Sequence, residues 1–279
     1  MVSESQLAVA SILELNFLPT HLRPFADIPL WAVIGVFASH FLGFFIRGAL
    51  GFGSNMPIVL LTAWLLGPHH AILLVVLAAF VAQIHLFPQG LGSADWAVTR
   101  PLIIGMVAGI GLGTWLFTVL AADWLTLLLG LLVTAIVLMD HFKVLPRLGS
   151  LVDLRSRLIT SSMAATSGFV GTISGGGGIY FLVGYLKLAC PTPQTLRGTN
   201  LVVSGIFMFA RFLFIALAGL VTTKLAIEAV LLLPVVFLGT WTGTRFFHTS
   251  SPARFYATLE VILLCAAVAL MAKGITDVA

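Results

Sequence analysis

The chain alternates long apolar runs with short polar connections. Eight of the runs reach or approach the roughly 20 residues that a helix needs to cross a bilayer, whereas the second and the seventh are about half that length. The pattern predicts an all-α polytopic membrane protein with ten helical segments, at residues 29–47, 55–66, 68–87, 96–121, 124–139, 158–174, 178–189, 193–220, 225–247 and 252–272.

Each half-length segment follows a break that is rich in glycine. Gly175 to Gly178 are four consecutive glycines, and Gly51 and Gly53 form a weaker break before residue 55. A glycine inside a helix costs about 1 kcal/mol relative to alanine, so we expect the helices to be interrupted at both places. Irregular backbone at membrane depth is tolerated only where it lines a cavity or is buried in protein. Each break is therefore a candidate binding site.

The two breaks belong to a longer repeated pattern. Residues 51–53 align with residues 176–178 at an offset of 125, Pro68 aligns with Pro193 at the same offset, and residues 113–115 recur at 239–241. We therefore expect two copies of one five-segment unit. The predicted organisation is an N-terminal segment at 1–28, a transmembrane repeat at 29–140, a basic linker at 141–157 and a second transmembrane repeat at 158–273.

Basic residues predict how the chain is oriented. The linker carries Lys143, Arg147 and Arg155, so it should lie in the cytoplasm, and the segment at 1–28 and both termini should then be extracytoplasmic. Each copy makes an odd number of net crossings, so the copies should be inverted relative to each other. Whether the half-length helices cross or re-enter stays open. Inverted repeats with glycine-interrupted helices are typical of secondary transporters.

Composition narrows the class further. Charged residues make up 9% of the 279 residues, against about 25% in a soluble domain, which leaves little room for one. The net charge of +4 comes from short loops and does not indicate nucleic-acid binding. Cys190 and Cys265 lie far apart in apolar surroundings and are expected to be buried thiols. The first 25 residues favour an interfacial amphipathic helix over a signal peptide.

The breaks have the chemistry of an anion site. A helix that restarts after a break presents free N–H groups and the positive end of its dipole, and neither break contains a carboxylate. Buried arginine is a natural partner for an oxyanion. The candidate substrate-binding residues are Gly51, Gly53, Ser54, Asn55, Ser174, Gly175, Gly176, Gly177, Gly178, Tyr180, Thr199, Asn200, Arg47 and Arg211.

Other interpretations of these residues stay open. The glycines could only allow close helix packing, as we expect for Gly105, Gly109 and Gly111. The arginines could extend to the membrane surface, or Arg211 could pair with Glu260.

Three titratable residues are candidates for proton coupling. His40, His85 and Glu260 lie within apolar segments, and Glu260 is the one acid that we expect to be embedded. Structural roles in helix packing or hydrogen bonding are the alternative for each.

Three stretches resemble the TauE/SafE family of membrane permeases, which is named for sulfite and organosulfonate export. They are the break at 48–55, the glycine pattern at 168–178 with its half-length helix, and the proline-initiated segment at 193–200. The resemblance extends over residues 29–273 and implies transport of a small sulfur-containing anion. The first copy departs from the family pattern in two ways. Phe52, Ser54 and Asn55 stand where the family tends to have glycine, and Pro68 is not followed by the pair of Thr or Ser residues that is typical of the family's proline-initiated helix.

These features together predict a secondary transporter in the cell inner membrane. It would export sulfite or an organosulfonate such as sulfoacetate by alternating access, with the site between the two breaks near the midplane. The alternatives are an anion channel, a permease for another small anion, and a membrane scaffold. No HExxH or GxSxG motif and no GxxxxGK loop is present, so we expect neither an enzyme nor an ATP-driven pump, and no cofactor or metal. The expected partners are the anion and the bilayer, and a homodimer stays open.

Overall fold

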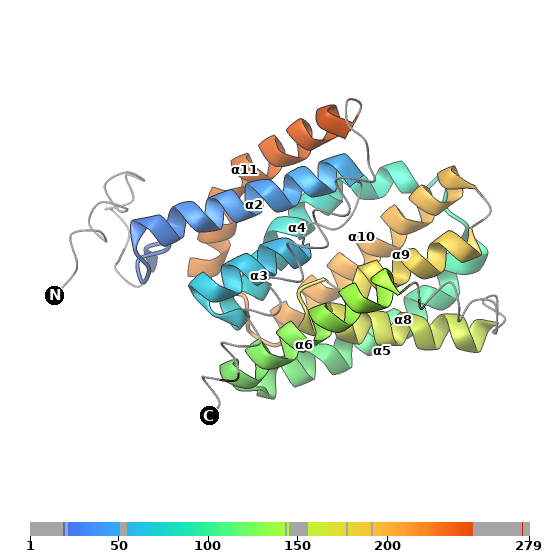
Figure 1. The fold of residues 1–279 in the computed structure, drawn as a ribbon, viewed down its shortest axis with the longest axis horizontal. Helices are drawn as coiled ribbons and strands as arrows, with labels where there is room; N and C mark the ends of the chain where they lie inside the picture. The colour runs from blue at the N-terminus through green and yellow to red at the C-terminus, as the bar shows by residue number, and fades with distance from the viewer. Residues whose placement is uncertain are drawn as a thin grey trace.

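The computed structural model describes residues 19, 22–50, 55–142, 144, 156–176, 178–190, 192–247 and 275. Regular structure in this part of the chain is helical, and Figure 1 shows the helices as an elongated bundle. The helices are α2 (Leu30–Leu50), α3 (Asn55–Leu66), α4 (Pro68–Gly90), α5 (Trp96–Val119), α6 (Ala122–His141), α8 (Arg157–Ile173), α9 (Gly178–Ala189), α10 (Pro193–Leu217) and α11 (Thr223–Phe247).

The all-α prediction is confirmed, and the helix limits follow local sequence signals. Pro68 and Pro193 begin α4 and α10, where a missing N–H costs nothing. Asp95 caps α5 by accepting hydrogen bonds from the N–H groups of Ala97 and Val98. The predicted segment at 252–272 lies outside the described residues. Within the described residues, four helices are long and apolar enough to cross a membrane: α2, α5, α10 and α11.

Both half-length helices fold back along the helix before them. In the first copy, Leu65 near the end of α3 lies beside Gly35 near the start of α2. In the second copy, the Ser167 hydroxyl donates to the carbonyl of Gly178, and near the other end of the pair the hydroxyls of Thr160 and Tyr185 lie 2.9 Å apart. The α2–α3 and α8–α9 pairs are therefore helical hairpins, in which each half-length helix runs antiparallel to the helix before it.

The remaining contacts give the direction of each helix. Helix α5 runs parallel to α8, because Gly105 packs on Ser161 and Gly109 on Ala165. It also runs parallel to α10, because Asp95 contacts Thr199 and Gly111 contacts Phe214.

Helix α4 runs antiparallel to α10. The ring of Phe80 stacks on Phe212 with centroids 4.5 Å apart, and Phe87 lies beside Gly205. Helices α2, α4 and α11 start at one end of the bundle, where Glu228 of α11 contacts Phe25 and His70. We call this the Glu228 end. Helices α5, α8 and α10 start at the opposite end, which we call the linker end. The two hairpins therefore enter the bundle from opposite ends.

Equivalent glycines pack on equivalent positions in the two copies. Gly113 of α5 contacts Phe169 of α8, and Gly239 of α11 contacts Phe44 of α2, which occupies the place of Phe169 at the offset of 125. Figure 1 shows α11 lying along α2. A Cβ atom at Gly105 or Gly109 would overlap backbone of α8, so the packing interpretation is confirmed for these two glycines. A Cβ atom added at Gly111 would make only an ordinary contact, at 3.4 Å from the ring of Phe214.

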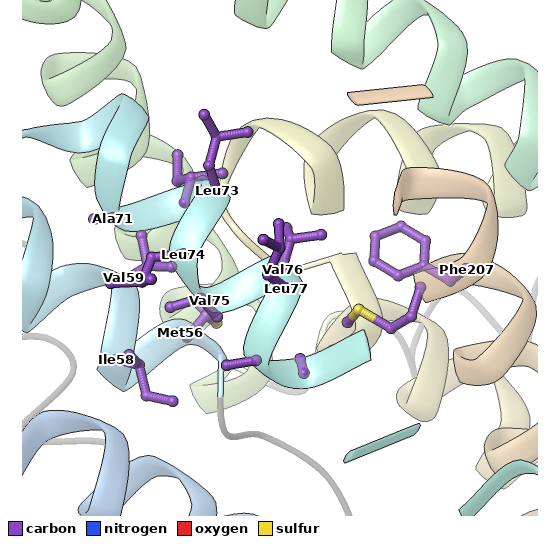
Figure 2. Close-up of a cluster of buried hydrophobic side chains, with 14 of the residues drawn as sticks. Met56, Ile58, Val59, Ala71, Leu73, Leu74, Val75, Val76, Leu77 and Phe207 are labelled. Carbon is purple, nitrogen blue, oxygen red and sulfur yellow. The ribbon is translucent and has the colours of Figure 1, made fainter. Parts of the chain in front are cut away.

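Apolar side chains fill the centre and also cover the outside. The core includes side chains of α3, α4 and α10, among them Val59, Leu74 and Phe207, which Figure 2 shows. Large apolar side chains such as Ile104 and Trp115 are exposed. Exposed apolar surface of this extent is expected where lipid is the solvent.

Candidate functional site at the hairpin tips

The tip of the second hairpin depends on two glycines. Helix α8 ends at Ile173, and the Ser174 N–H and hydroxyl both donate to the carbonyl of Val170. The chain then turns through Gly175 and Gly176, with φ of +73° and +131°. Residues with a Cβ atom rarely adopt these angles, so the turn requires glycine.

The two hairpins meet at their tips. Asn55 is the first residue of α3 and is buried, and a Cβ atom added at Gly176 would lie 2.7 Å from the Asn55 Cβ atom. A side chain at Gly175 would collide with Val59 of α3. The N-terminus of one half-length helix therefore rests on the turn that precedes the other, which brings two positive helix ends close together.

Arg211 of α10 lies beside the second tip. Its side chain is 1% exposed, and Nη2 donates to the carbonyl of Thr172 at 2.7 Å. The guanidinium carbon lies 5.9 Å from the centre of the Phe207 ring. The Nε and Nη1 groups have no hydrogen-bond acceptor among the described residues. A buried charged group with unmatched donors is costly, so this arginine is prepared to receive an acceptor.

Arg47 lies at the end of α2, in the last turns before the first tip. It is 7% exposed, and its Nη2 donates to the Gln83 side chain, whose own amide donates to the carbonyl of Leu201 at 3.0 Å. Its Nε has no acceptor among the described residues. Neither arginine reaches the surface, and no carboxylate of the described chain pairs with either of them.

The two arginines occupy matching places although they do not align in sequence. Arg47 aligns with Thr172 at the offset of 125, and each residue lies in the last turn of the first helix of a hairpin. In the first copy, the side chain of Arg47 donates to Gln83 of α4. In the second copy, the carbonyl of Thr172 accepts from Arg211 of α10. The charge therefore comes from the hairpin in one copy and from the helix behind it in the other.

Thr199 and Asn200 lie elsewhere on α10. The Thr199 hydroxyl accepts the N–H of Asp95 at 2.9 Å, and the Asn200 side chain accepts the Ser204 hydroxyl. Helix α10 instead packs on the second hairpin through Phe207, which lies against Gly171. Thr199 and Asn200 therefore lie about two turns away from this contact, toward the linker end.

The other predicted residues are placed only in part. His40 is buried in α2, its Nδ1–H donates to the carbonyl of Val36 at 2.8 Å, and its Nε2 has no partner among the described residues. His85 and Tyr180 lie in α4 and α9, and the structure describes their backbone alone. The predicted residues outside the described part of the chain are Gly51, Gly53, Ser54, Gly177 and Glu260.

Sequence reasoning missed a buried acid. Glu228 of α11 is 1% exposed, accepts the N–H of Phe25 at 2.9 Å and lies 2.6 Å from the Nε2 atom of His70. Glu260, the one acid that the sequence analysis expected to be embedded, lies outside the described residues. Glu228 lies close to the start of an apolar segment and was not singled out in the sequence. The carboxylate is buried because α4 and the residues before α2 cover it.

Comparison with known proteins gives one result. A family model described as "Sulfite exporter TauE/SafE" matches residues 36–270, which is 235 of the 279 residues (270 − 36 + 1). Searches of curated proteins and of solved structures found no match. The matched range includes the second hairpin, most of the first and both buried arginines.

Proposed function

This chain belongs to the sulfite exporter TauE/SafE family, and on that premise we propose that it exports sulfite or an organosulfonate such as sulfoacetate by alternating access. The family is one of transporters, and the chain is a multi-pass membrane protein. We therefore propose three things beyond the family: which anion is transported, how it is transported, and where it binds.

The observation that carries the proposal is Arg211 with its two unmatched donors. The guanidinium is buried beside the second tip, and no carboxylate of the described chain neutralises it. A planar guanidinium can donate two parallel hydrogen bonds to two oxygens of one anion. Sulfite and sulfonate groups offer such oxygens and the charge that the site needs.

The backbone at the tips supports the same ligand. The helix start at Asn55 lies against Gly176, next to the start of α9. Unpaired N–H groups at helix starts bind oxyanions without any charged side chain. The anion would then lie between the two tips, with Arg211 on the α10 side and Arg47 toward α4.

The directions of the helices support alternating access between inverted copies. The hairpins enter from opposite ends, and the equivalent helices α4 and α10 run antiparallel. Basic residues gather at the linker end, namely Arg100, Arg157, Lys187, Arg197 and Arg245. The positive-inside rule places that end in the cytoplasm and both termini outside, in an inner membrane.

The test is thermal unfolding of the purified protein in detergent with sulfite, sulfoacetate, taurine, sulfate, acetate or chloride. A ligand at 100 times its dissociation constant stabilises the folded state by about 2.7 kcal/mol. We expect sulfite or a sulfonate to raise the midpoint and Arg211→Gln to weaken binding by roughly 10- to 100-fold, because hydrogen bonds to charged groups contribute about 1.5–3 kcal/mol.

The matched control is Arg197→Gln, which removes a charge from an exposed position of the same helix. This variant should keep the midpoint shift. If no sulfur anion shifts the midpoint, or if both variants lose the shift equally, the site is not the one proposed. A channel on the same architecture would give flux that does not saturate with anion concentration.

A further inference from the structure

At the Glu228 end, a buried carboxylate lies between α4 of the other copy and the residues before α2. Glu228 of α11 uses one oxygen to accept the N–H of Phe25 and the other to contact His70 of α4. The Glu228 side chain is 1% exposed, whereas that of His70 is 33% exposed. Water can therefore deliver a proton to the pair from the His70 side.

The contact joins the two copies. Glu228 belongs to the second copy, whereas His70 belongs to the first, and Phe25 lies in the N-terminal segment that leads into it. One turn earlier in α11, Lys224 forms an ion pair with Asp27. Movement of one copy against the other at this end would have to separate both pairs.

The linker end is closed by different chemistry. There Gly90 of α4 and Gly198 of α10 pack closely, and the N–H of Asp95 donates to Thr199. The carboxylate of Asp95 accepts N–H groups of its own helix. No ion pair between the copies is described at this end, where the titratable neighbours are the Cys190 thiol and Asp95.

We propose that His70 and Glu228 form a proton-binding latch that closes the Glu228 end and opens when it takes up a second proton. While Glu228 is a carboxylate, it accepts a hydrogen bond from a neutral imidazole that donates its Nε2–H or, after one proton binds at Nδ1, from an imidazolium. A second proton forms the O–H bond of the acid on Glu228. The carboxylate charge that holds the imidazolium is then lost, and α11 can separate from α4.

Other charged groups surround the latch without replacing it. Lys224 and Asp27 pair with each other, and His69 lies 3.1 Å from the carbonyl of Phe117. The titratable and charged groups on the described elements packed around the pair are Arg23, Asp27, His69, Asp123 and Lys224 at this end, with His40, Arg47 and Arg211 deeper in the bundle.

The latch rests on the proposed function only for its link to transport, so opening is measured without any anion. Hydrogen exchange of the Phe25 amide reports the bond to Glu228 directly, after correction for the intrinsic effect of pH. One linked proton changes the open fraction by up to about tenfold per pH unit. We expect protection of this amide to fall as the pH is lowered far enough for Glu228 to take up its proton.

The variants are Glu228→Gln and His70→Gln, with His69→Gln as the matched control. Either latch variant should give weak, pH-independent protection and should flatten the pH dependence of sulfite flux in proteoliposomes, whereas the control should behave like the wild type. Having two variants keeps the test valid if one of them does not fold.

The latch is overturned if wild-type protection does not change with pH, or if a latch variant keeps the wild-type profile. If protection responds to pH as expected but no sulfur anion shifts the unfolding midpoint, the latch stands and the proposed substrate fails. The two proposals therefore fail in different measurements.

Discussion

The two hairpins each pair a longer helix with a half-length helix but carry their charges differently. At the first tip, Arg47 is part of the hairpin, and Gln83 occupies one of its nitrogen atoms and links it to Leu201 of α10. At the second tip the hairpin supplies only a carbonyl, and Arg211 reaches it from α10 with two donors unmatched. Repeated backbone can therefore hold one asymmetric ligand, because the side chains need not repeat.

The difference also ranks the two arginines. Arg47 has one fully buried nitrogen without an acceptor among the described residues, whereas Arg211 has two and is the more deeply buried side chain. Arg211 should therefore contribute more to anion binding. Three further variants test the contact between the tips, the ranking of the arginines and the position of the ligand.

The largest effect should come from Gly175→Ala, which fills the contact between the tips. Alanine at φ +73° costs about 1–2 kcal/mol, and its Cβ atom would also collide with Val59 of α3. Overpacking of this kind adds about 1–3 kcal/mol. We expect a lower unfolding midpoint and a weaker sulfite-induced shift.

Gly219→Ala is the matched control, because Gly219 has φ of +70° and no atom within 4 Å of an added Cβ. It should show the backbone cost alone and keep the anion shift. If the two variants lose equal stability and both keep the shift, the tips are not in functional contact.

The sequence predicted the elements of this site better than their partners. Proline and glycine act locally, so the limits of α3 and α9 coincide with the predicted segments at 55–66 and 178–189. The repeat alignment also anticipated the equivalent packing of Gly113 and Gly239. The direction of the half-length helices could not be predicted, because crossing and re-entry leave the later loops on the same sides.

The partners of the polar residues come from tertiary packing. Arg211 contacts Thr172, 39 positions earlier in the chain, and Glu228 contacts Phe25, 203 positions earlier. Hydrophobic periodicity carries no information about such pairs. The repeat offset pairs Arg47 with Thr172 and does not show that Arg211 serves the equivalent place. The sequence pattern singled out neither His70 nor its partner Glu228.

A smaller effect is expected from Arg47→Gln. The Nη2 group of Arg47 already donates to Gln83, and Arg47 has fewer buried nitrogen atoms without an acceptor than Arg211. Loss of a single hydrogen bond to a charged group is worth about 1.5–3 kcal/mol, and we expect the low end of that range, roughly tenfold in affinity. The measurement is the dissociation constant for sulfite, compared with those of Arg211→Gln and the exposed control Arg197→Gln. A larger loss for Arg47→Gln than for Arg211→Gln would reverse the ranking of the tips.

The smallest effect is expected from Tyr185→Phe, which removes the hydroxyl that links α9 to Thr160 of α8. The first hairpin is joined at the corresponding depth by Leu65 packing on Gly35, so a polar link is not essential to the shape. The loss should be about 1 kcal/mol of stability, the usual value of one buried hydrogen bond. Thr62→Val is the control, because the Thr62 hydroxyl bonds only to Ile58 of its own helix.

Sulfite affinity should not change in Tyr185→Phe. Tyr185 is seven residues beyond the first residue of α9, which places it about 10 Å from the tip along the helix. A variant that kept its stability but lost the anion shift would show that the ligand lies along the hairpin and not at its tip. The residues that bind the anion would then have to be sought along the full length of each hairpin and not only at the tips.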